Sequence, residues 1–105
     1  MSDDAVWADL RQVVLATTSP AEVAGELRAK LGLGRGFGDP ELQAFGIDDD
    51  TMAVGADTFL EVVSPTTAEH PIAAWLARRG GSAGYLLSVQ VSDVDACPAG
   101  RARHG

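Results

Sequence analysis

The sequence of 105 residues contains a single cysteine, Cys97, so no disulfide can form within the chain. Its first four residues, Met-Ser-Asp-Asp, are acidic, whereas a signal peptide begins with a positively charged region. No stretch approaches the roughly 20 apolar residues that a membrane-spanning helix needs. These absences favour a protein of the reducing cytoplasm without a membrane partner.

Basic residues are also scarce. The chain has 8 Lys and Arg against 15 Asp and Glu, which gives a formal net charge of −7. Nucleic acids and anionic membranes are bound through clustered Lys and Arg, so we expect neither as a partner. The length corresponds to one domain, in which a single small core can form.

The clearest local signal is a helix that starts at Ser19-Pro20 and stops at Gly32. Ser19 is an N-cap residue, Glu22 is placed to complete a capping box, and Pro20 suits the first helical position. Glycine after the last turn is the usual helix stop. One apolar stripe recurs every four residues, at Val23, Leu27 and Leu31.

Runs of β-branched and aromatic residues predict the strands. They fall at residues 10–17, 42–47, 51–54, 58–63 and 84–91, with a short helix at 71–79. Asp48-Asp49-Asp50 and Gly55-Ala56-Asp57 are expected to form tight turns, and Ser92-Asp93-Val94-Asp95 to begin another helix. The order is strand, helix, three strands, helix, strand, which predicts an α+β sheet.

Four other features point only weakly to chemistry. The glycine-rich segment 32–40 follows a helix, whereas a phosphate-binding loop follows a strand, so we expect a flexible loop there. Asp48-Asp49-Asp50 lacks the glycine and distal glutamate of a calcium loop. Cys97 has no CxxC partner, and His70 stands alone in a polar connection.

The order of elements resembles the vicinal oxygen chelate superfamily, which includes glyoxalase I, bleomycin-resistance proteins and methylmalonyl-CoA epimerase. The strand at 12–17 with its Ser19-Pro20 helix start, "KLGL" at 30–33, "DTFLEVVSP" at 57–65 and "GYLLSVQVSDVDA" at 84–96 carry the resemblance. It implies a glyoxalase/bleomycin-resistance-like βαβββ module at 10–65 after a lead-in at 1–9. A linking helix at 66–83, the first strand of a second module at 84–97 and a tail at 98–105 follow.

Metal-using members of that superfamily carry one ligand at the start of the first strand of a module and a glutamate in its last strand. The resemblance places these roles on Gln12 and Glu61, with Glu61 also a candidate catalytic base. Leu86 occupies the equivalent place in the second module, and leucine cannot bind a metal. The resemblance therefore implies either a divalent metal such as Mg²⁺ or Mn²⁺, or a metal-free binding site.

Side-chain alternation assigns Glu61 to one face of its strand. Glu61 shares a face with Phe59 and Val63, while Leu60 and Val62 share the other and should pack on the apolar helix stripe. Two readings of Glu61 remain open. The resemblance implies that it points into a ligand site on the face of Gln12, Val14 and Ala16, and the alternative is a solvated side chain on the open face of the sheet.

The resemblance implies a binding protein for a small oxygenated metabolite, with a lyase or isomerase activity as one possibility. Non-catalytic sequestration of an antibiotic or metabolite, or a module without activity of its own, are the alternatives. Val14, Phe45 and Phe59 are expected to line an apolar pocket. Because one sheet supplies half of a cup, we expect a homodimer that completes it.

Overall fold

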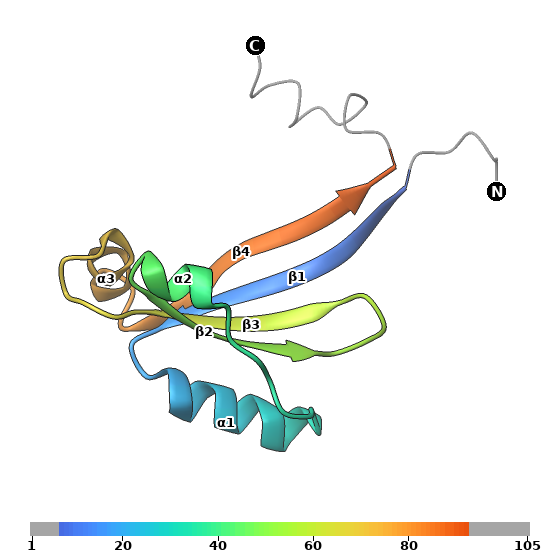
Figure 1. Ribbon diagram of the computed structural model, residues 1–105, viewed down its shortest axis with the longest axis horizontal. Coiled ribbons are helices and arrows are strands. Elements are labelled where there is room, and N and C mark those ends of the chain that lie inside the picture. The colour runs from blue at the N-terminus through green and yellow to red at the C-terminus, as the bar shows by residue number, and fades with distance from the viewer. Residues whose placement is uncertain (1–6, 93–105) are drawn as a thin grey trace, which may run out of the picture.

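The computed structural model describes residues 7–92, which form a four-stranded sheet with three helices (Figure 1). The strand order is β2 (Ile47–Ala53), β3 (Phe59–Pro65), β1 (Ala8–Thr17), β4 (Ser82–Val91). β1 and β3 are parallel, and the other two pairs are antiparallel. The α+β class and the glyoxalase-like fold are confirmed. The predicted helix start at 93–95, Cys97 and the tail lie outside the described residues.

Helix α1 (Pro20–Leu31) begins and ends where the sequence predicts. Gly32 has φ 68°, a left-handed conformation that glycine adopts without the steric cost a side chain would add. The predicted capping box is not formed, because the Ser19 side chain makes no cap hydrogen bond. Instead the Ser19 N–H donates to Thr17 Oγ1 at 3.0 Å, which ties the helix start to the end of β1.

A helix packs on each face of the sheet, and each face has its own apolar cluster. α1 covers one face, where Met52, Leu60, Val62 and Ala24 are buried. Val13, Leu15, Val23 and Leu27 pack against this cluster, as the alternation of side chains predicts. Leu31, the third residue of the predicted stripe, is 57% exposed, and Leu33 packs there instead.

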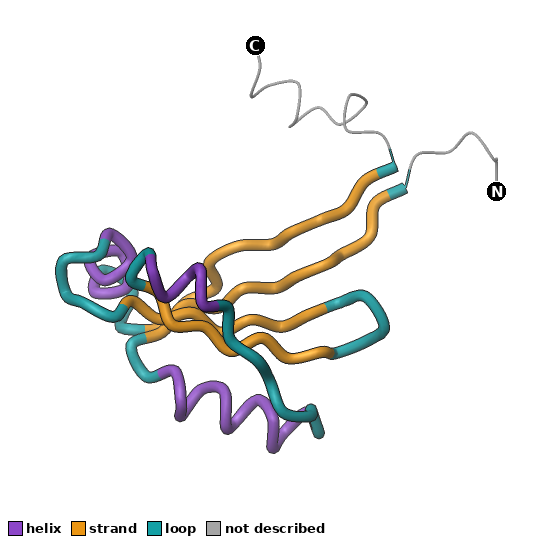
Figure 2. The backbone as a smooth tube through the Cα atoms, viewed as in Figure 1, coloured by secondary structure: helices purple, strands orange, loops and turns teal. Residues whose placement is uncertain are grey.

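Helix α3 (Pro71–Ala77) packs on the opposite face, near one end of the sheet (Figure 2). Its Ile72 and Leu76 side chains are buried with Val14, Ala16 and Val63. His70 caps this helix, since its Nδ1 accepts the Ile72 N–H at 3.1 Å. α3 contacts the ends of β1 and β3, so it leaves the middle of this face for other groups.

The strand predicted at residues 42–47 is wrong. Residues Pro40–Ala44 form a short helix, α2, and β2 begins only at Ile47. Asp39 caps α2 by accepting the Glu41 N–H at 2.9 Å, and Pro40 occupies the first helical position. An Asp-Pro pair is a helix-start signal, and here it outweighs the β-propensity of the residues that follow.

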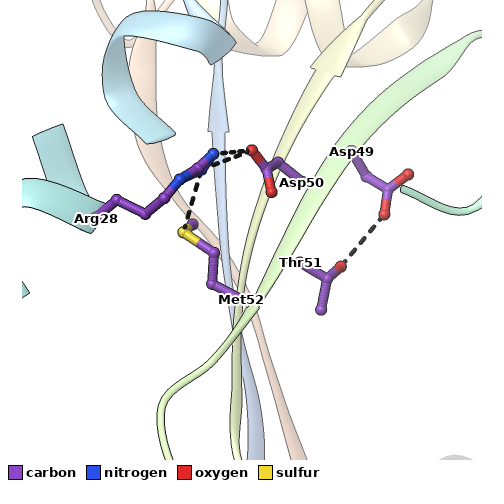
Figure 3. A network of polar contacts seen from close by, with 5 residues as sticks. All are labelled: Arg28, Asp49, Asp50, Thr51 and Met52. Carbon is purple, nitrogen blue, oxygen red and sulfur yellow. Dashed lines mark hydrogen bonds and ion pairs between the residues drawn. The ribbon is translucent and has the colours of Figure 1, made fainter. Parts of the chain in front are cut away.

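The turn predicted at Asp48-Asp49-Asp50 is also wrong, because all three residues lie in β2. Aspartate is a poor strand former, but here the side chains have partners. Arg28 of α1 donates to Asp50 Oδ2 at 2.6 and 3.1 Å on one side of the strand (Figure 3). On the other side Asp49 Oδ1 accepts the Asp39 N–H at 2.7 Å.

β4 extends the predicted strand by two residues at its start and pairs with β1 along most of its length. The pairing register shifts at two places, near Arg11 in β1 and near Tyr85 in β4. Tyr85 meets Trp75 of α3 edge to face, with ring centroids 5.1 Å apart. Among residues 7–92, no helix is long and apolar enough to span a membrane.

Candidate functional site

Glu61 lies in the middle of β3, on the face away from α1. Alternation puts its side chain opposite to those of Leu60 and Val62, which pack under α1. Only 8% of Glu61 is exposed, so the alternative of a solvated side chain is wrong. A buried carboxyl is costly unless it has hydrogen-bonding partners, and its neighbours therefore define the site.

Gln12 is the first of these neighbours. Its Nε2 donates to Glu61 Oε1 at 2.7 Å, across the parallel pairing of β1 with β3. The two residues are 49 positions apart in the sequence, and the pairing of β1 with β3 brings them together. The two candidate residues from the sequence, Gln12 and Glu61, thus contact each other on the face of the sheet that α3 only partly covers.

Thr51 and Asp49 of β2 complete the group on the other side of Glu61. Thr51 lies directly opposite Glu61 in the antiparallel register, and its Oγ1 is 3.3 Å from Glu61 Oε2. The same hydroxyl is 3.3 Å from Asp49 Oδ2 (Figure 3). A hydroxyl has one proton, so Thr51 can donate to only one of these two carboxyl groups at a time.

This arrangement raises the pKa of Glu61 above its ordinary value of 4.5. Burial is the largest cause, and the hydrogen bond with Asp49 and the negative charge of Asp49 add to it. The Thr51 hydroxyl acts in the opposite direction, and the more distant charge of Asp39 raises the pKa slightly further. The Glu61 carboxyl therefore holds its proton more tightly than an ordinary glutamate does.

A side chain with a raised pKa can exchange protons near neutral pH more readily than an ordinary glutamate. In this group Glu61 is the proton-exchanging member. Gln12 carries a second N–H on the same nitrogen, because a primary amide has two donors. The group can thus bind an oxygen-bearing ligand and move a proton on it.

The three residues predicted to line an apolar pocket, Val14, Phe45 and Phe59, differ in how deeply they are buried. Val14 is buried, and with Leu86 it borders a shallow hollow of about 280 Å³ between β1 and β4. Phe59 is half-buried and meets Phe37 edge to face, with ring centroids 6.4 Å apart. Phe45, at the end of α2, is 73% exposed.

Two residues of β4, the strand next to β1, border the site. Leu86 pairs with Val14 and Ser88 pairs with Gln12, so both lie on the face that carries Glu61. Leu86 is 53% exposed and presents an apolar surface where the resemblance would place a ligand atom. Ser88 brings a hydroxyl to the strand position beside Gln12.

The residues present do not make a complete site for a divalent metal. A catalytic metal site holds about three protein ligands, and Gln12 and Glu61 provide two. The Gln12 nitrogen, rather than its carbonyl oxygen, faces Glu61, so in this arrangement the amide oxygen does not point toward the carboxyl group as a second ligand would. Within residues 7–92, no group of three His, Cys, Asp or Glu side chains is placed to hold a metal.

Sequence reasoning missed Asp49, Thr51 and Ser88. The aspartate run concealed Asp49, because three consecutive Asp residues are typical of a turn rather than a strand. Thr51 was predicted to lie in a strand, but its pairing opposite Glu61 was not. One signal was available, since Thr51 and Met52 already alternate between opposite faces and the alternation continues back to Asp49. Ser88 could be placed beside Gln12 only once the pairing register of β1 with β4 was known.

Solved structures share this fold. Methylmalonyl-CoA epimerase from Mycobacterium tuberculosis is 25% identical with a TM-score of 0.69, covering 90% of this chain and 63% of its own. A hypothetical protein from Bacillus halodurans is 22% identical with a TM-score of 0.70, covering 93% and 69% respectively. A Streptomyces coelicolor methylmalonyl-CoA epimerase variant, in complex with 2-nitronate-propionyl-CoA, is 20% identical with a TM-score of 0.68, covering 91% and 68%.

Neither a protein-family model nor a curated protein sequence matches the chain. The structural neighbours include several methylmalonyl-CoA epimerases, which supports the superfamily that the sequence resembles. The chain spans 63% of the length of the Mycobacterium tuberculosis enzyme.

Proposed function

We propose that this protein binds a small oxygenated metabolite on the open face of its sheet and catalyses an isomerase-type proton transfer on it. The observation that carries the proposal is the 2.7 Å hydrogen bond between Gln12 and Glu61 on that face. The fold of methylmalonyl-CoA epimerases around this pair supports the proposal. The substrate class is an acyl compound with an acidic C–H beside a carbonyl group.

In the proposed reaction the ionised Glu61 carboxylate removes the proton from the carbon beside the carbonyl. The electron pair of the broken C–H bond moves into the carbonyl to give an enolate. The free N–H of Gln12 donates to the enolate oxygen, where the negative charge develops. The protonated Glu61 exchanges its proton with solvent and returns one to the carbon, which restores the carbonyl and the Glu61 carboxylate, so no other reactant is consumed. A raised pKa suits Glu61 to this role, because a base works best near the operating pH.

The test follows hydrogen exchange directly. Methylmalonyl-CoA, a ligand of one structural neighbour, is incubated with the protein in D₂O, and deuterium at the carbon between the two carbonyls is measured by NMR. We expect exchange above the uncatalysed rate, reduced about 10²- to 10⁴-fold in Glu61→Gln, the usual contribution of a general base. Glu69→Gln, which replaces an exposed glutamate outside the site, is the matched control.

A second function is favoured by Leu86. Its exposed apolar side chain on the face of Glu61 suits binding without turnover, as in a protein that sequesters a metabolite or an antibiotic. Calorimetry with the same acyl-CoA distinguishes the two functions. Binding without deuterium exchange indicates sequestration, and neither binding nor exchange indicates a module without activity of its own.

A divalent metal held by Gln12 and Glu61 remains a separate proposal that the resemblance suggests. It requires Gln12 to turn its carbonyl oxygen, instead of its amide nitrogen, toward the ion, and the Glu61 carboxylate to bind the ion from the other side. Elemental analysis of the purified protein tests it. A stoichiometric metal that disappears in Glu61→Ala supports metal binding, and a protein without metal contradicts it.

The homodimer belongs to this proposal as well. One sheet provides a face with Gln12 and Glu61, and a second copy would extend the surface around them. The exposed apolar residues of β4 support the presence of a partner.

A further inference from the structure

Four large apolar side chains of the edge strand β4 are exposed: Tyr85, Leu86, Leu87 and Val89. β4 is the last strand of the sheet, and no strand pairs with its outer edge within residues 7–92. Such an edge presents unpaired N–H and C=O groups that can accept another strand. β1 and β4 extend together past the helices, which leaves this edge uncovered (Figure 1).

Apolar side chains project from both faces of this edge. Leu86 faces the site with Val14, while Leu87 pairs with Val13 on the opposite face. Leu87 is 65% exposed and Val89 is 49% exposed. A surface strand normally turns apolar residues to one face only, so exposure of both faces indicates that another structure covers β4.

The two edges of the sheet differ in charge. The outer edge strand at the other side, β2, carries Asp48-Asp49-Asp50, and charged side chains protect an edge against pairing. β4 has no charged residue and no proline between Ser82 and Val91, which are the usual protective residues. Its only irregularity is the register shift near Tyr85. The sequence therefore protects one edge and leaves the other able to pair.

We propose that β4 pairs antiparallel with β4 of a second copy of this chain, so that two sheets join into one. An uncharged strand can face its own copy about a two-fold axis without placing like charges opposite each other. The acidic β2 strands would lie about 34 Å apart, which is seven spacings of roughly 4.8 Å. That exceeds the Debye length of about 8–10 Å, so the net charge of −7 does not prevent association.

The exposed apolar area of β4 supports such an interface. Four large side chains of β4 are between 44% and 65% exposed: Tyr85, Leu86, Leu87 and Val89. At roughly 150–200 Å² for a fully exposed side chain of this size, they present on the order of 300–400 Å² per copy. This is about half of the roughly 800 Å² per partner that a stable complex buries, and the paired backbone edge adds to it.

This inference rests on the proposed function in one respect, namely whether the dimer has one shared ligand site or one site in each copy. The Gln12 residues of the two copies would be three strand spacings apart, or about 14 Å. The Gln12–Glu61 pair of one copy and that of the other therefore do not share one ligand. Each copy keeps its own Gln12 and Glu61, and the partner's β4 extends the wall beyond Leu86 and Ser88. The dimer thus has two separate sites rather than one shared four-ligand site.

The test measures mass in solution without ligand, by sedimentation equilibrium between about 5 and 200 µM. One chain has a mass of 10.9 kDa, and we expect twice this value for the wild type. Leu87→Lys and Val89→Lys place a charge on the edge and should give monomers with unchanged far-UV circular dichroism. Leu31→Lys, the same kind of change at an exposed site on α1, should remain a dimer.

A wild type that stays monomeric at 200 µM overturns the proposal, as do folded edge variants that remain dimers. Hydrogen exchange on the wild type gives an answer even if both variants fail to fold. Protection of β4 amides should rise with protein concentration, while protection of β2 amides should not. A dimer that neither binds nor exchanges the acyl-CoA refutes only the proposed function, and an active monomer refutes only this interface.

Discussion

Replacing Glu61 with glutamine should stabilise the protein at neutral pH. The Glu61 carboxyl is buried beside Asp49, so its ionised form is disfavoured in the folded state. A glutamine of nearly the same shape can still accept the hydrogen bond from Gln12 and can donate to Asp49. Glu61→Gln therefore removes a buried charge without removing the partners that surround it.

The sign of the pH dependence follows from the raised pKa. The folded state holds the Glu61 proton more tightly than the unfolded chain, whose value lies near 4.5. This tighter binding stabilises the wild type fully below that value, and the stabilisation is lost as pH rises through the folded pKa. Each unit by which folding raises the pKa corresponds to about 1.4 kcal/mol. The advantage of Glu61→Gln should therefore grow as pH rises, then level off.

Urea unfolding from pH 4 to pH 8, followed by tryptophan fluorescence, measures this difference in the free energy of unfolding. Glu69→Gln, at an exposed position, should differ from the wild type by less than about 0.5 kcal/mol at every pH. The reasoning is refuted if the difference between Glu61→Gln and wild type does not change with pH. It is also refuted if the wild type is the more stable protein at pH 8.

Three further changes test the fold. Leu76→Ala, at a fully buried position, should lower the free energy of unfolding by about 2–5 kcal/mol, whereas Leu31→Ala at an exposed site should cost less than about 1 kcal/mol. A double-mutant cycle of Arg28→Ala and Asp50→Ala should give a coupling of about 1–2 kcal/mol that weakens in 1 M salt; a value near zero would show that the 2.6 Å ion pair contributes nothing. Gly32→Ala should cost about 1 kcal/mol because φ is 68° there, and an unchanged melting temperature would contradict that reading.

The elements with strong local signals could be predicted from the sequence. α1 has a proline at its start and a left-handed glycine at its end, and both signals act within a few residues. The cores of β1, β3 and β4 are runs of strand-forming residues that local propensity identifies. Alternation grouped Glu61 with Phe59 and Val63 on one side of its strand, because a strand turns every second side chain to the same side. The family resemblance then placed Gln12 on the same face of the sheet.

The region from 39 to 53 could not be read correctly in the same way. Strand β2 contains three consecutive aspartates, which local propensity assigns to a turn. Their stability in a strand depends on Arg28 from α1 and on the backbone of Asp39, which the folded chain brings to them. Long-range contacts of this kind leave no pattern in the local sequence.

The sequence by itself determined the order of most elements, the face on which Glu61 lies and the acidic character of the molecule, because propensity, alternation and charge are properties of neighbouring residues. Only the tertiary structure decided that Glu61 is buried, that Gln12 and Thr51 hold it, and that Asp49 raises its pKa. It also decided that β4 is an edge strand. These properties depend on which strands pair and in which register, and pairing joins residues that are far apart in the chain.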